Sequence, residues 1–158
     1  MSSLYDDDIL LWSEQQAAAI RRLGRNAREI PNELDIENVA EEIESVGRSE
    51  LAAVESYLEL IFVHLIRLFV EPDSTAVRHW RGEVAGFHAN ARRRYSPSMR
   101  QRIDVNALWR SALEQSLLGY EGAQHERVAG LTTESPFALD ELLADKIDVL
   151  RLADRLRS

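Results

Sequence analysis

Two polar residues, Glu50 and His64, occur in a segment that otherwise places apolar side chains along one face of a helix. An α-helix has about 3.6 residues per turn. At that period residues 34–69 place Glu50 near the middle of the apolar face and His64 near its edge. The face consists of Ile36, Val39, Ile43, Val46, Val54, Tyr57, Ile61, Leu65 and Leu68. A carboxylate in such a position is costly without a partner, so we expect Glu50 to be buried and paired.

Glu50 and His64 are the only candidates for catalysis, and both are weak. A buried carboxylate can act as a general acid or base, but buried structural carboxylates are commoner. His64 is better interpreted as a buried imidazole that is hydrogen-bonded to its neighbours. The chain has no G-x-S-x-G elbow, glycine-rich phosphate loop or H-E-x-x-H motif. The sequence therefore favours a protein that is not an enzyme.

Metal ligands are not spaced as a metal site requires. Helical bundles that bind two iron ions use Glu-x-x-His pairs, and the chain has none. Glu50 and His64 are fourteen residues apart, which is about 21 Å along a helix at ~1.5 Å per residue. His79 could lie level with His64, but it projects away from the Trp80 face of its own predicted helix. Cysteine is absent, which excludes thiolate metal ligands. We expect neither a metal ion nor a cofactor.

Composition and charge limit the class of protein. The chain has 158 residues, 45% hydrophobic and 29% charged, as expected for a single α-helical domain spanning 1–158. A net charge of −8 makes a nucleic-acid partner an unlikely class. No apolar run approaches the ~20 residues that cross a membrane, and the first residues are acidic where a secretory signal would be basic. A cytoplasmic protein is expected.

The charges are unevenly distributed along the chain. Residues 33–59 contain nine acids and one base, Arg48, whereas residues 78–102 contain seven arginines and one acid, Glu83. The arginine-rich stretch could bind an anion or nucleic acid. The interpretation we favour is a basic helix beside the acidic one, with several ion pairs between them.

The order of elements predicts an all-α protein, an antiparallel bundle of four to six helices with one long central helix. Helices are expected at residues 3–23, 34–69, 74–95 and 98–129, with a last helix opened by Ser135-Pro136. Gly24 should end the first helix, and Asp35 should cap the second. The apolar face keeps its phase across Gly47, which favours one continuous helix. The alternative is a helix end at Gly47 and a new start at Ser49.

Several motifs together resemble the bacterial family known as domain of unknown function 29. The central stretch is similar to its L-D-x-x-N-x-x-E-E-I-E-x-x-G-x-S-E signature, and further fragments resemble its opening, H-L-L-K, P…W and C-P-W patterns. The matching positions are Tyr5, Asp8, Trp12, Gln16, Leu34, Asp35, Asn38, Glu41, Glu42, Ile43, Glu44, Gly47, Ser49, Glu50, His64, Leu65, Ile66, Arg67, Pro72, Trp80, Ser135, Pro136 and Phe137. Ser135 replaces the family's cysteine. The resemblance implies an α-helical bacterial protein and supplies no catalytic residue.

A hairpin folded at Pro72 would place Glu50 level with position 94 of the following helix. The predicted partner of Glu50 is therefore Arg94, Tyr95 or a residue near Asp8 and Trp12.

Two functions remain open. One is an interaction or regulatory module that binds a protein partner or a second copy of itself through a surface. The other is a small enzyme or ligand-binding bundle built on Glu50 and His64. A cleft opening onto either residue would favour the second.

Overall fold

The computed structural model describes residues 2–158. Within that range all regular secondary structure is helical, and there is no strand. The helices are α1 (Leu4–Asp7), α2 (Ile9–Asn26), α3 (Ile36–Val70), α4 (Val77–Arg94), α5 (Val105–Gly119), α6 (Gly122–Ala129), α7 (Leu139–Leu142) and α8 (Val149–Asp154), with 3-10 turns η1 (Pro97–Gln101) and η2 (Arg155–Arg157). None of the helices in this range is both long and apolar enough to cross a membrane. The all-α class and the long central helix are confirmed.

Contacts divide the chain into two compact units. Unit 1 comprises the residues up to Ala53 together with Arg94–Arg102, and unit 2 comprises Val54–Arg93 and Ile103–Ser158. Helix α3 is continuous through Gly47, as predicted, so its first half belongs to unit 1 and its second half to unit 2. The expected single domain over 1–158 stays a prediction.

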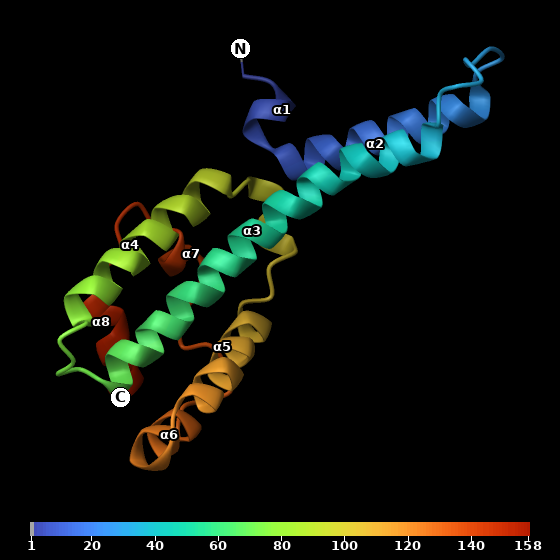
Figure 1. The fold of residues 1–158 in the computed structure, drawn as a ribbon. Coiled ribbons are helices and arrows are strands. Elements are labelled where there is room, and N and C mark those ends of the chain that lie inside the picture. The colour runs from blue at the N-terminus through green and yellow to red at the C-terminus, as the bar shows by residue number, and fades with distance from the viewer. Residues whose placement is uncertain (1) are drawn as a thin grey trace. The chain divides into compact units, whose positions relative to one another are not determined.

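In unit 1, α2 runs antiparallel to the first half of α3 (Figure 1). The helices meet closely at two glycines. A Cβ added at Gly24 would lie 2.6 Å from Ile36, and one at Gly47 would lie 2.1 Å from Ser13 and 3.0 Å from the Leu10 backbone. The prediction that Gly24 ends the first helix is therefore wrong: α2 continues to Asn26, and Gly24 is the point where α3 approaches.

The buried face of α3 in unit 1 differs from the predicted apolar stripe. Val39 and Val46 are exposed, whereas Ala40 and Gly47 are buried. Small residues line the contact because the two helices lie close together, and α2 contributes Ser13 and Ala17 in the same way. The buried face predicted from hydrophobicity alone is therefore displaced by about one residue along α3 from the observed buried face.

The predicted helix over 3–23 is broken at Asp8, which ends α1 and caps α2. Its buried carboxylate accepts hydrogen bonds from the Leu11 amide at 3.1 Å, the Ser98 amide at 2.8 Å and the Ser98 hydroxyl at 2.6 Å. The Asp8 side chain thereby accepts from a free amide in the first turn of α2 and also attaches the start of η1 to that helix.

Unit 2 is built around the second half of α3. Residues 61–66 are all buried, so this part of the helix is covered on every side. Phe62 packs edge-on against Trp109 of α5, with ring centroids 5.3 Å apart, and stacks on Phe137 at 6.0 Å. The Trp109 indole N–H donates to the Thr132 carbonyl at 2.8 Å. These three rings form the centre of the unit 2 core.

Two further predicted helices are divided, which together with the break at Asp8 raises the number of α-helices in residues 2–158 from the predicted five to eight. The stretch 98–129 forms η1, α5 and α6, because Asp104 caps α5 through the Ala107 amide and Gly122 takes a positive φ of 56°. The stretch after Ser135-Pro136 forms only the short helices α7 and α8, the latter capped by Asp148.

Alanine at two α-helical glycines should have opposite effects. Gly47→Ala should lower the free energy of unfolding by about 1–3 kcal/mol, since the new methyl group overlaps Ser13 and Leu10. Gly82→Ala should raise it by about 0.5–1 kcal/mol, because nothing lies within 4 Å of the added Cβ and alanine favours the helix. Urea unfolding followed by circular dichroism measures both. Shifts of the same sign would contradict the packing described for α2 and α3.

Candidate functional site

Glu50, the first of the two candidates, lies in unit 1 and is only half-buried. Its side chain is 29% exposed, and its Oε1 accepts a hydrogen bond from Arg94 Nη1 at 2.8 Å. Arg94 as the partner is confirmed, but full burial was wrong. The close contact of α2 with Ala40 and Gly47 leaves Glu50 at the flank of the buried face. An ion pair this exposed contributes about 0–1 kcal/mol.

The predicted ladder of ion pairs between the acidic and arginine-rich stretches is largely replaced by other pairs. Arg94–Glu50 does join the two stretches. Other acids of the first stretch pair instead with Arg21 of α2 and with Arg48 of α3 itself. These ion pairs are Arg21–Glu37, Arg21–Glu41, Arg21–Glu44, Arg48–Glu41 and Arg48–Glu44. The acidic face of α3 therefore pairs mainly with its near neighbours in unit 1.

His64, the second candidate, lies in unit 2 and is buried, as predicted. Its Nδ1 is 2.8 Å from the Leu60 carbonyl oxygen, one helical turn earlier, and its Nε2 is 2.8 Å from Glu83 Oε2 of α4. The ring also meets Phe87 edge-on, with centroids 5.1 Å apart. Both ring nitrogens of His64 therefore face acceptor oxygens.

Glu83 connects the buried histidine to an exposed one. Its second oxygen, Oε1, is 3.5 Å from Nε2 of His79, whose side chain is 73% exposed. The hydrogen bond from His64 lowers the pKa of Glu83, and the charges of His64, His79 and Arg67 lower it further against the opposing effect of burial. The carboxylate therefore stays ionised between two imidazoles.

Sequence reasoning missed this arrangement. His79 was expected to point away from the stripe, but Glu83, one turn later on α4, links it to His64. The available signal was that Glu83 is the only acid among the arginines of 78–102 and lies four residues after His79.

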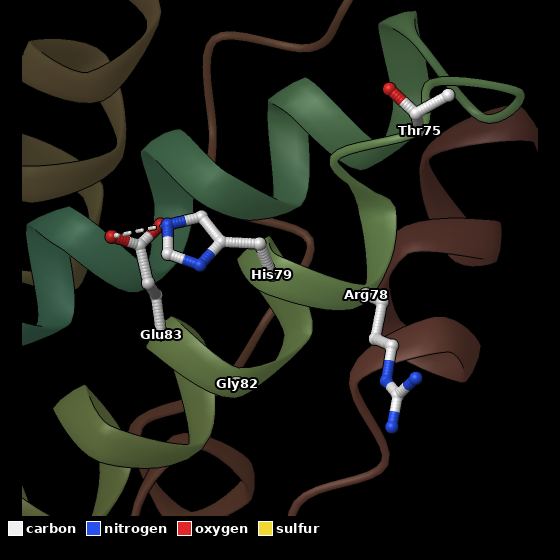
Figure 2. Close-up of a pocket in the computed structure, with 5 residues that line it drawn as sticks. All are labelled: Thr75, Arg78, His79, Gly82 and Glu83. Atoms are coloured by element: carbon white, nitrogen blue, oxygen red, sulfur yellow. Dashed lines mark ion pairs between the residues drawn. The ribbon is translucent and has the colours of Figure 1, made fainter.

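An open cavity of about 650 Å³ borders this pair, lined by Thr75, Arg78, His79, Gly82 and Glu83 (Figure 2). His64 is not part of the lining. Figure 2 shows Thr75 at the opposite end from His79 and Glu83, so the Thr75 hydroxyl is not beside the imidazole as a nucleophile would be. No group of three or more His, Asp or Glu within residues 2–158 is arranged to hold a metal ion. Glu83 instead joins buried His64 of α3 to exposed His79 of α4.

The pair should give stability a defined pH dependence. The lowered pKa means that ionised Glu83 stabilises the fold fully above its ordinary value of 4.5, and that this contribution is lost as the pH falls through the lower folded value. We expect Glu83→Gln to destabilise the protein at neutral pH and to differ little from wild type in strong acid. Urea unfolding across this range, with exposed Glu114→Gln as control, measures the difference. An equal loss at every pH would contradict a stabilising role for the ionised Glu83 carboxylate.

Comparison with known proteins supplies a family but no activity. A family model described as "Domain of unknown function DUF29" matches residues 4–147, nearly the whole chain. The chain is also similar to a solved alpha-helical protein of unknown function from Rhodospirillum rubrum, with 32% identity, a TM-score of 0.86 and 99% of each chain covered. None of the curated proteins matches the chain.

Proposed function

Since the chain belongs to the family of domain of unknown function DUF29, whose description assigns no activity, we propose that it is a helical interaction module that binds an acidic segment of a partner protein. The proposal includes a cytoplasmic site of action, which suits a chain without cysteine. The binding surface is the outward side of α4 in unit 2, together with the loop that precedes α8.

The two residues that could have carried catalysis are already engaged. His64 is buried and bonded through both ring nitrogens, and it lines neither of the cavities beside α4. Glu50 is paired with Arg94. The buried and hydrogen-bonded state of His64 is the one expected of a module that acts through a surface, whereas Glu50 is paired but 29% exposed.

The observation that carries the proposal is a cavity whose lining contains three basic side chains and Gly82. A cavity of about 710 Å³ is lined by Arg78, Arg81, Gly82, Ala85, Lys146, Ile147, Asp148 and Val149, which we call the α4 face. Among residues 2–158, Arg78, Arg81 and Lys146 form no ion pair. The one acid of the lining, Asp148, caps α8 through the Arg151 amide. Three uncompensated cations in a chain of net charge −8 suit an acidic ligand.

The loop that carries Lys146 is held against α4 by two side chains of that helix. His88 Nε2 donates to the Ala144 carbonyl at 2.8 Å, and Arg92 pairs with Asp145. This attachment fixes Lys146 and Ile147 beside Arg78 and Arg81. A preformed wall of this kind lowers the entropic cost of binding.

Glycine at 82 and 86 has no packing reason within the chain, because nothing lies within 4 Å of a Cβ added at either position. Each costs about 1 kcal/mol of helix stability relative to alanine. A bare helix surface allows another backbone to approach closely. That favours a peptide segment, seated between the cations and the apolar Ala85 and Ile147, over a nucleic-acid strand.

The test is binding of a fluorescently labelled glutamate-rich peptide to the full chain, followed by anisotropy. We expect salt-sensitive binding that Arg78→Glu with Arg81→Glu weakens about tenfold or more. The matched control is Arg25→Glu with Arg110→Glu, which makes the same charge change at exposed arginines that are not part of the α4 face.

Three outcomes would overturn the proposal. One is an equal loss in the control, which would show attraction to net charge alone. Another is tighter binding of an oligothymidylate strand than of the peptide. The third is a concentration-dependent dimer that the Arg78 and Arg81 changes dissociate, because the occupant would then be a second copy of this chain.

A further inference from the structure

A third cavity in unit 2 has the size and the charges of a small-molecule site. It measures about 250 Å³, below the ~300–1,000 Å³ of pockets for drug-sized ligands. Three helices and the residues that directly follow two of them form its walls: Val63 and Arg67 of α3 with Glu71 after it, Trp80 of α4, and Gln115, Ser116 and Gly119 of α5 with Tyr120 after it. It contains neither Glu50 nor His64.

Arg67 and Glu71 bring opposite charges to the same wall without neutralising each other. Arg67 lies in the last turn of α3, and Glu71 directly follows the helix, with its amide donating to the Arg67 carbonyl at 2.8 Å, yet their side chains form no ion pair with each other. Glu71 Oε1 accepts a hydrogen bond from Gln124 at 3.2 Å, which leaves Oε2 available. Within residues 2–158 the Arg67 guanidinium forms no hydrogen bond or ion pair.

The remaining lining adds one hydroxyl and an apolar surface. Burial raises the pKa of Tyr120, and the carboxylate of Glu71 raises it further while Arg67 opposes the change. The phenol therefore keeps its proton and can donate a hydrogen bond. Ser116 donates to the Ala112 carbonyl within α5, so its proton is already used. Val63 and the Trp80 ring supply the apolar part of the wall.

We propose that this cavity binds a free α-amino acid. Its carboxylate would lie on the Arg67 guanidinium and the Tyr120 hydroxyl, its ammonium on Glu71, and its side chain against Val63 and Trp80. A guanidinium, a carboxylate and a phenol facing a space this small match a zwitterion better than a simple anion, which Glu71 would repel, or a simple amine, which Arg67 would repel.

The test uses the indole N–H signals of the three tryptophans in the ¹⁵N spectrum of the full chain. Each of the common L-amino acids is added in turn. Binding should shift the Trp80 signal and leave that of Trp109, which is buried and bonded to Thr132, unchanged. Trp80→Phe identifies the signal. The N-acetyl and amide derivatives of the best ligand should each bind at least about tenfold more weakly, since each removes one charge.

Substitutions of residues that line the cavity provide a second test. Arg67→Gln and Glu71→Gln should each weaken binding by about tenfold or more, while Arg110→Gln, on an exposed side of α5, should not change it. The proposal is overturned if no amino acid shifts the Trp80 signal, or if the N-acetyl or the amide derivative binds as well as the free amino acid. The ligand series is run on the wild-type chain, so it decides the matter even where a variant folds poorly.

Discussion

Replacing Asp8 by alanine is expected to lower the free energy of unfolding by about 3 kcal/mol, one of the two largest losses predicted for this chain. Three donors lose their acceptor: the amides of Leu11 and Ser98 and the Ser98 hydroxyl. Loss of a helix cap alone costs about 0.5–2 kcal/mol, and each buried donor left without a partner adds about 1–3 kcal/mol. Urea unfolding followed by circular dichroism measures the loss.

The matched control for Asp8 is Asp35→Ala, because Asp35 caps α3 through the Asn38 amide at 3.1 Å but is exposed. It should cost about 1 kcal/mol. Burial by itself raises the pKa of Asp8, and the hydrogen bonds from Ser98 and Leu11 together lower it below 3.8. The difference between wild type and Asp8→Ala should therefore shrink as the pH falls below that value. If Asp8→Ala costs no more than Asp35→Ala, the described role of Asp8 is wrong.

Trp109→Ala should cost about 3–5 kcal/mol, the range typical of removing a large buried aromatic residue. Trp109 is fully buried, packs against the rings of Phe62 and Phe137, and donates to the Thr132 carbonyl. Thermal unfolding followed by calorimetry gives the size of the loss. Trp109→Phe should cost less, because it keeps a ring against Phe62 and loses mainly the bond to Thr132.

Together these substitutions test the predicted single domain. Asp8 lies in unit 1 and Trp109 in unit 2, and α3 continues through both units. We propose that the chain unfolds in one transition, so both substitutions should lower the same melting temperature. Two transitions, each sensitive to only one of the substitutions, would show two domains instead.

The sequence predicted those features that depend on neighbouring residues. Asp35 as the cap of α3, the continuity of α3 through Gly47, and the end of that helix before Pro72 all follow from local chemistry and helical period. A simple count along a hairpin placed Arg94 among three candidate partners of Glu50, and Arg94 is the one that binds it. These predictions required no knowledge of how distant segments pack.

Features set by distant segments were missed. Asp8 interrupts a good helical pattern because residue 98, ninety positions later, supplies donors for its carboxylate. The buried face of α3 follows Ala40 and Gly47, because contact distance to α2 favours small side chains over hydrophobic ones. Glu83 was considered only as one charge among many, since its two histidine partners become apparent only when α3 and α4 are placed together.

The second half of α3 has a consequence for the synthesis of the protein on the ribosome. Residues 61–66 are covered on all sides, but their partners, among them Glu83, Phe87, Trp109 and Phe137, come later in the chain. The last of these partners, Phe137, lies 67 residues after Val70, and at ~5–20 residues per second translation to that point takes about 3–13 s. During that time the most hydrophobic helix of the protein leaves the ribosome without its cover. The nascent chain at this stage should therefore be a substrate for chaperones that recognise exposed apolar segments.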